Sequence, residues 1–142
     1  MKRYLPVLIL AVLVYGYDLY RDAASQKPPP AAAETTLQEA YARRQGDIQV
    51  EGAGRVVKIL SDDLEGSRHQ RFIIELDSGQ TLLVSHNIDL APRIGGLRVG
   101  DEITFYGEYE WNPRGGVIHW THHDPAGRHA DGWIRHRGRT YR

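Results

Sequence analysis

The chain concentrates histidine and aspartate in one segment near its C-terminal end. Four histidines and Asp124 fall within the eleven residues from His119 to His129. Imidazole and carboxylate groups bind Zn²⁺ and related metals, and they also act as general acids and bases. Residues three apart on an ideal strand face opposite ways, so His119 and His122 can share a ligand only if the chain bends, which Asp124-Pro125 favours. The segment is therefore a candidate metal or acid–base site.

A second polar group stands where the third predicted strand ends. His86, Asn87 and Asp89 lie there beside a long connection, and loops held by a rigid sheet often carry binding and catalytic residues. His69 and Arg71 share the outward face of the preceding strand. If these two strands are neighbours, His69 and His86 lie near one end of the domain.

These patterns predict one polar site. The catalytic candidates are His86, Asp89, His119 and Asp124. The predicted ligand-binding residues are His69, Arg71, Asn87 and Trp120, and the predicted metal ligands are His86, His119 and His122. The candidate cofactor is a divalent metal such as zinc, and because the chain has no cysteine, histidine and carboxylate must hold it. The alternative is that these side chains cap turns and bond to the backbone.

Apolar and polar residues alternate with a period of two through the middle of the chain, which predicts strands. The predicted strands are Gln49–Ser61, His69–Leu76, Thr81–His86, Glu102–Trp111 and Val117–Thr121. Gly52 and Gly54 predict a bulge or bend in the first strand. The predicted core residues are Phe72, Ile74, Leu83, Ile103, Phe105 and Ile118. The sequence therefore predicts an all-β fold, a small five-stranded OB-fold-like barrel over residues 46–125, with an SH3-like barrel or a small sandwich as alternatives.

The N-terminus predicts a membrane-targeting helix. Residues 4–17 are uncharged and mostly apolar, and they follow Lys2 and Arg3. Fourteen residues make about 21 Å of helix, which is short of a hydrocarbon core of about 30 Å and fits either a signal anchor or a signal peptide over residues 1–20. The charges before the helix place the rest of the chain outside the cytoplasm. A Pro/Ala-rich linker at 21–34 and a short helix at 35–45 are predicted next; Thr36 and Glu39 form its capping box.

The 142 residues carry no net charge, yet the charge is unevenly distributed. By count, residues 1–45 carry net +2, residues 46–112 net −6 and residues 113–142 net +4. The neutral total excludes a protein that binds polyanions over its whole surface. Residues 126–142 are predicted to form a basic tail, which either rests in solvent or on the acidic body, or meets an anionic partner.

Four motifs resemble one bacterial family. They are His69-Gln-Arg-Phe72, His86-Asn-Ile-Asp-Leu-Ala-Pro-Arg93, Gly107-Glu-Tyr-Glu-Trp-Asn112 and Gly115-Gly-Val-Ile-His-Trp-Thr-His-His-Asp-Pro125, with Gly132-Trp133 after them. Over roughly residues 45–141 the chain is similar to the family called domain of unknown function 3465. The resemblance implies a bacterial source and supplies no substrate.

Together these observations predict a protein of the bacterial inner membrane whose domain faces the periplasm, or one secreted to the periplasm if the signal is cleaved. Its leading function is an envelope-located ligand-binding module with a His/Asp-rich polar site. The alternatives are a metal-assisted hydrolase of phosphodiester or glycan bonds and a structural adaptor of an envelope complex. The expected partners are the membrane, through residues 4–20, and a small-molecule, glycan or nucleic-acid ligand.

Overall fold

The computed structural model describes residues 30–142. The predicted signal anchor or signal peptide at residues 1–20 and residues 21–29 of the predicted linker lie outside this range. Within the described range, no helix combines the length and the apolar character that crossing a membrane requires.

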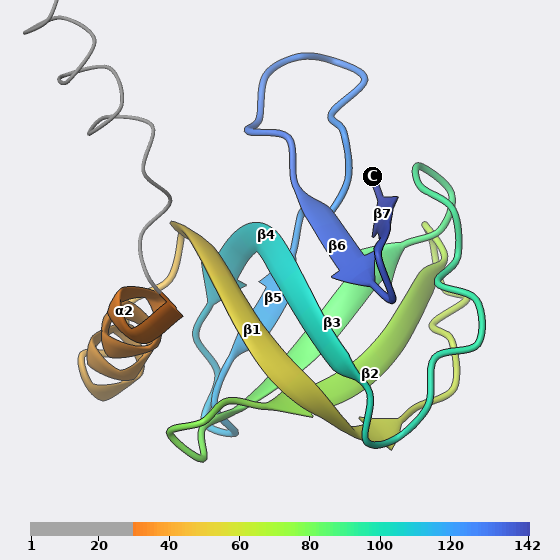
Figure 1. The fold of residues 1–142 in the computed structure, drawn as a ribbon. Helices are drawn as coiled ribbons and strands as arrows, with labels where there is room; N and C mark the ends of the chain where they lie inside the picture. The colour runs from red at the N-terminus through yellow and green to blue at the C-terminus, as the bar shows by residue number, and fades with distance from the viewer. Residues whose placement is uncertain (1–29) are drawn as a thin grey trace, which may run out of the picture.

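The described residues form one helix and one sheet of seven strands (Figure 1). The elements are α2 (Pro30–Ala42), β1 (Ile48–Ile59), β2 (His69–Glu75), β3 (Thr81–Asn87), β4 (Glu102–Glu110), β5 (Val117–His119), β6 (Trp133–His136) and β7 (Arg139–Tyr141). The strand order is β1-β2-β3-β5-β4-β6-β7, and β1 also pairs with β4, which closes the first five strands into a barrel. The prediction of a mostly β chain with a five-stranded barrel is confirmed.

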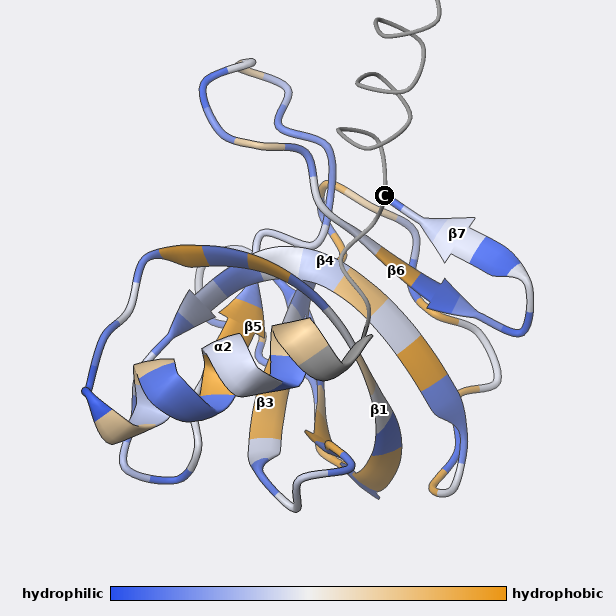
Figure 2. Ribbon diagram, turned by 60° about the vertical axis from the view of Figure 1, so that its left-hand side comes forward, coloured by the Kyte–Doolittle hydropathy of each residue, from blue (hydrophilic) through white to orange (hydrophobic). Residues whose placement is uncertain are grey.

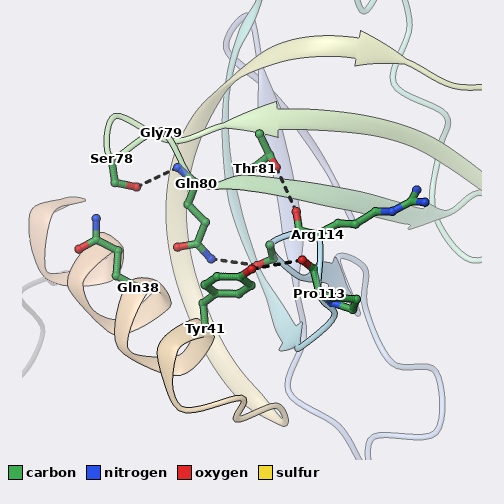
Figure 3. A pocket seen from close by; sticks show the side chains of 9 residues that line it. Gln38, Tyr41, Ser78, Gly79, Gln80, Thr81, Pro113 and Arg114 are labelled. Atoms are coloured by element: carbon green, nitrogen blue, oxygen red, sulfur yellow. Dashed lines mark hydrogen bonds between the residues drawn. The ribbon is translucent and has the colours of Figure 1, made fainter.

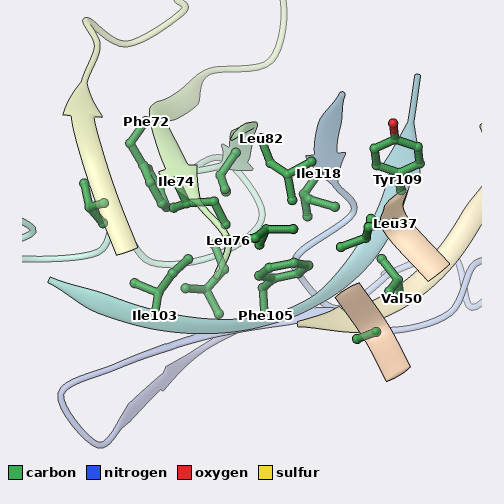
Figure 4. Packing of buried hydrophobic residues seen from close by; sticks show 14 of the residues in the cluster. Leu37, Val50, Phe72, Ile74, Leu76, Leu82, Ile103, Phe105, Tyr109 and Ile118 are labelled. Carbon is green, nitrogen blue, oxygen red and sulfur yellow. The ribbon is translucent and has the colours of Figure 1, made fainter. Parts of the chain in front are cut away.

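Strand alternation decides which side chains fill the barrel (Figure 4). Five of the six predicted core residues are buried, and Leu83 is the exception. On β3, Leu82 and Val84 face inward and are fully buried, so Leu83 between them must face outward and is only half-buried. The prediction for Leu83 is therefore wrong by one position on the strand.

The glycines of β1 are closely packed against core side chains. Gly52 and Gly54 pair in continuous register with β4, so the predicted bulge is wrong at these glycines, although β1 is curved along its length (Figure 1). The irregularity falls between Val56 and Lys58 instead. A Cβ at Gly52 would lie 2.7 Å from the Phe105 ring, so glycine there leaves room for a core aromatic side chain.

The helix α2 begins at Pro30, five residues earlier than predicted, so the end of the predicted linker is helical. The predicted capping box is wrong, because Thr36 lies inside the helix and its Oγ1 donates a hydrogen bond to Ala32 O at 2.9 Å. Figure 2 shows α2 lying against the barrel, and Leu37 of this helix belongs to the buried cluster drawn in Figure 4. The described core residues on this helix are Ala33, Leu37 and Ala40.

The predicted basic tail at residues 126–142 is not a separate tail, because its apolar residues complete the sheet. β5 pairs with residues 108–110 of β4, and β6 pairs with residues 103–106 further along β4. Ile134 is fully buried and Tyr141 nearly so. The chain therefore pairs with β4 twice, first through β5 and then through β6. The loop between β5 and β6 stands out from the barrel (Figure 1).

Candidate functional site

One cavity beside the barrel gathers five of the predicted site residues from separate segments. It has a volume of about 240 Å³, and we call it the imidazole cavity. Its lining residues are Ser67, His69, Ser85, Asn87, Leu90, His119, Trp120 and His122. They come together because β3 lies between β2 and β5 in the sheet, so the start of β2 meets the ends of β3 and β5.

Backbone carbonyls orient two of the three imidazoles in this cavity. His69 Nδ1 lies 2.8 Å from Ser67 O, and His122 Nδ1 lies 2.8 Å from His123 O. A carbonyl oxygen only accepts hydrogen bonds, so each Nδ1 carries a proton. In the neutral rings, Nε2 therefore keeps its lone pair, which can accept a hydrogen bond from a ligand or bind a metal.

Trp120 lines the imidazole cavity in a strained conformation. Its φ is 53°, in the left-handed region that a bulky residue rarely adopts. Its ring stacks on His129, with the centroids 4.0 Å apart and the planes at 9°. Gly132 passes close behind it, since a Cβ there would lie 1.9 Å from Trp120 O. Such strain persists only where the surroundings enforce it, and it is concentrated at ligand and active sites.

A second group of ligating side chains adjoins the cavity through His119. The pairing of β4 with β5 places Glu108 opposite His119, and Glu110 follows two residues later on the same face. One donor atom from each of the three residues lies within 4.8 Å of the other two. In residues 30–142 this is the only such set of three or more histidine and acidic side chains. We call Glu108, Glu110 and His119 the carboxylate cluster.

Charge is distributed unequally over the carboxylate cluster. Glu108 Oε2 is hydrogen-bonded to Nε2 of His129, whose Nδ1 donates to Ala130 O at 2.9 Å. Burial opposes charge on His129, but these two bonds raise its pKa. Burial also acts to raise the pKa of Glu108, yet hydrogen bonds with His129 and Glu110 lower it overall. Burial, followed by the hydrogen bond with Glu108, raises the pKa of Glu110. The two carboxyl groups are thus pushed toward opposite protonation states.

His86 lies in the interior and does not line the imidazole cavity. The structure therefore does not bring His86, His119 and His122 together as the predicted metal ligands. His86 is fully buried, with Nδ1 2.8 Å from Thr121 Oγ1 and Nε2 3.0 Å from Pro92 O. Because both ring nitrogens are occupied, neither faces a ligand. Burial lowers the pKa of His86 to about 4, so the ring is neutral at ordinary pH.

Three other predicted residues bond to backbone groups outside the cavity lining. Asp89 accepts hydrogen bonds from the backbone N–H and the Nε of Arg68, at 2.8 and 2.7 Å, which lower its pKa. Arg71 donates to Ser61 O at 3.1 Å. Asp124 accepts from three backbone N–H groups of the β5–β6 loop, which lower its pKa. For these residues the alternative of a structural role matches their observed contacts.

A larger cavity of about 460 Å³ lies between α2 and two hairpins, and it contains none of the predicted site residues (Figure 3). Its polar groups tie the surrounding elements together. Tyr41 donates its hydroxyl proton to Pro113 O at 3.2 Å, and Gln80 Nε2 donates to Gly115 O at 2.9 Å. With these groups used in structural contacts, the imidazole cavity is the better candidate site despite its smaller volume.

Sequence reasoning missed the two glutamates, although their signal is present. Tyr109 is buried, so alternation places Glu108 and Glu110 together on the outer face of β4. The hairpin at residues 112–116 then brings the first of them opposite His119. His129 gives no such signal, because its place beside Glu108 depends on the path of a loop. The other lining residues missed were Ser67, Ser85 and Leu90.

Comparison with known proteins agrees with the family that the four motifs indicate. A family model described as "Protein of unknown function (DUF3465)" matches residues 21–142. The match covers β6 and β7 together with the barrel. No curated protein matches the sequence.

Proposed function

This chain belongs to the DUF3465 family, and we propose that it is an envelope-located module that binds a small hydroxylated ligand in the imidazole cavity. The observation that carries the proposal is the convergence of His69, His119 and His122 from three segments on one cavity beside the strained Trp120. Imidazole groups alone occur in many structural roles, but these three share one small solvent-accessible hollow.

The chemistry of the lining favours a ligand rich in hydroxyl groups. His69 and His122 offer ring nitrogens that accept hydrogen bonds when neutral, and Ser67 and Ser85 can donate or accept. Trp120 adds an aromatic surface. A cavity of about 240 Å³ is smaller than the roughly 300–1,000 Å³ of sites for drug-sized ligands. A single sugar ring, or the terminal sugar of a glycan, therefore suits it best.

The strand order supports an OB-like barrel, and the imidazole cavity lies where domains of this type bind their ligands. A closed order of β1-β2-β3-β5-β4 with parallel β3 and β5 agrees with the predicted OB-like topology. Domains of this type bind oligosaccharides and oligonucleotides on strands two and three and on adjoining loops. The imidazole cavity lies at one end of β2 and β3, and Ser67 belongs to the connection before β2.

The binding proposal can be tested with a panel of monosaccharides, amino sugars and nucleosides. Ligand-observed NMR on the purified full-length chain, with EDTA present, should detect at least one binder. Ser85→Leu places an isobutyl group in the cavity and should abolish that signal. Ser78→Leu is the matched control, because Ser78 lines the larger cavity and not this one. Absence of any binder, or equal binding by the Ser85→Leu variant, would contradict the proposal.

The envelope location has support from the sequence alone. The apolar run at residues 4–17, the preceding Lys2 and Arg3, and the Pro/Ala-rich stretch after it are typical of an exported or anchored chain. Alkaline phosphatase fused to the C-terminus should be active in cells, because this reporter folds only outside the cytoplasm. Fractionation then separates an anchored chain, found with membranes, from a cleaved one in the periplasmic extract. An inactive fusion would contradict export.

A further inference from the structure

The carboxylate cluster has the composition and arrangement of a three-ligand metal site. Glu108 and Glu110 project from β4, and His119 projects from the neighbouring β5. Their donor atoms already lie within 4.8 Å of one another. The site is sheltered, since the Glu108 side chain is 12% exposed and the His119 side chain 35% exposed. Rigid paired strands, rather than a mobile loop, hold all three ligands.

The ring nitrogen at the centre of this cluster lacks a satisfactory partner within the protein. His119 Nε2 is buried and makes no hydrogen bond, although Glu108 Oε1 lies only 3.5 Å away. If Nε2 carries a proton, a buried donor is unsatisfied; if it carries a lone pair, that lone pair faces a carboxylate oxygen. A cation between the two atoms would resolve both situations, because each atom would then serve as a ligand.

Neighbouring groups orient the two carboxylates in the way that outer contacts orient metal ligands. His129 holds Oε2 of Glu108, and this leaves Oε1 on the side of His119. The backbone N–H of Asp47 donates to Oε1 of Glu110 at 3.1 Å. Hydrogen bonds of this kind fix the direction of ligating carboxylates and are a regular feature of metal sites.

We propose that Glu108, Glu110 and His119 bind one divalent transition-metal ion, with Zn²⁺ as the best match. One imidazole nitrogen with two carboxylates suits zinc better than Mg²⁺, which prefers an all-oxygen shell. Three protein ligands leave a coordination position open, as in catalytic zinc sites. This inference goes beyond the ligand-binding proposal and does not depend on it, although His119 belongs to both sites.

The test is stoichiometric metal binding by the full-length chain, prepared without a polyhistidine tag and stripped with a chelator. Isothermal titration with ZnCl₂ and elemental analysis after dialysis should give one zinc per chain, and MgCl₂ at the same concentration should give none. His119→Gln and Glu110→Gln should each weaken zinc binding at least tenfold. His123→Gln, at an exposed histidine outside the cluster, is the matched control and should bind as the wild type does. Circular dichroism checks that each variant is folded.

Co²⁺ provides a second measurement that depends on ligand identity. Its visible absorption should appear on binding to the wild type and to His123→Gln. It should be lost in Glu110→Gln, which removes a charged ligand but keeps the size and shape of the side chain at a half-buried position. Failure of the wild type to bind zinc stoichiometrically, or equal affinity in all three variants, would overturn the inference. Because the sugar-panel experiment is run in EDTA, failure of the metal site leaves the ligand proposal standing, and the reverse also holds.

Discussion

Acid should destabilise this domain through His86, which lies inside the barrel. Burial is the main reason that the pKa of this ring falls from 6.5 to about 4. The hydrogen bond to Pro92 O acts in the opposite direction, and the neighbouring His122 and His69 lower the pKa further. The folded state therefore requires a neutral ring, whereas the unfolded chain takes up a proton at its ordinary pKa. Stability is complete above pH 6.5 and declines as the pH falls from there toward 4.

The size of the effect follows from the two pKa values. With 6.5 in the unfolded chain and about 4 in the folded one, lowering the pH from 7 to 5 should reduce the free energy of unfolding by about 2 kcal/mol. The loss should approach about 3 kcal/mol below pH 4, since one pKa unit corresponds to about 1.4 kcal/mol. For a domain of this size, about 2 kcal/mol is a large share of a total stability of roughly 5–15 kcal/mol.

The substitution that tests this is His86→Gln. The amide of glutamine can both donate and accept hydrogen bonds, as the neutral ring does, but it does not titrate. The variant should lose stability at pH 7, yet its free energy of unfolding should change by about 2 kcal/mol less than the wild type between pH 7 and pH 5. Val84→Ala, two residues earlier on the same buried face of β3, is the control. It should cost about 1–3 kcal/mol at every pH and keep the wild-type pH dependence.

The assay is urea denaturation followed by tryptophan fluorescence at pH 7, 6 and 5. If His86→Gln and wild type lose equal stability on acidification, protonation of the His86 ring does not cause the acid sensitivity of the domain. The same conclusion follows if the Val84→Ala control also loses the pH dependence.

Three further substitutions test single contacts. Gly107→Ala would place a Cβ 2.5 Å from His119 O, so it should destabilise the protein by about 1–3 kcal/mol in urea denaturation; wild-type stability would contradict this packing. Gln70→Leu removes both hydrogen bonds from the buried backbone of Ile94, and each group left without a partner should lower the free energy of unfolding in urea by about 1–3 kcal/mol. A loss near zero would show that water replaces the side chain. Asp124 accepts backbone hydrogen bonds that lower its pKa. Its loop should therefore stay ordered above the ordinary carboxyl pKa of about 3.9 and open as the pH falls through the lower pKa of the folded state. Amide hydrogen exchange of the loop should show this acid step in the wild type and lose it in Asp124→Asn.

The five barrel strands could be predicted because alternation is a local property. Each predicted strand lies within a few residues of the observed one, and the inward face of β2 is the predicted one. β6 and β7 could not be predicted in the same way. They are three or four residues long, and Arg135, Arg137 and Arg139 obscure their pattern. Only the structure shows why β6 forms: residues 103–106 of β4 extend past β5, and β6 pairs with their backbone.

The sequence predicted the kinds of side chain in the candidate site better than it predicted which individual residues line it. The histidine-rich segment singled out His119 and His122, and the outward face of the second predicted strand singled out His69; these three do line one cavity. The position of His86 at the end of the third predicted strand pointed equally to a site, but its ring faces the interior. Alternation along β3 already places His86 on the same face as Val84. Only the contacts with Pro92 O and with Thr121, 35 residues away, show that both ring nitrogens are satisfied there.

Residue types and short-range spacing were enough to predict the periodicity of the strands, the family and the residues able to bind a metal or a polar ligand. They also exclude thiol chemistry, because the chain has no cysteine. The tertiary structure decided which imidazoles keep a free nitrogen, which carboxylates adjoin them, and that the basic C-terminal segment is part of the sheet. The physical reason is that a side chain's protonation, tautomer and accessibility depend on neighbours brought close by strand pairing and by loop paths. Glu108 illustrates this, because it meets His119 across a strand pair and His129 across a loop.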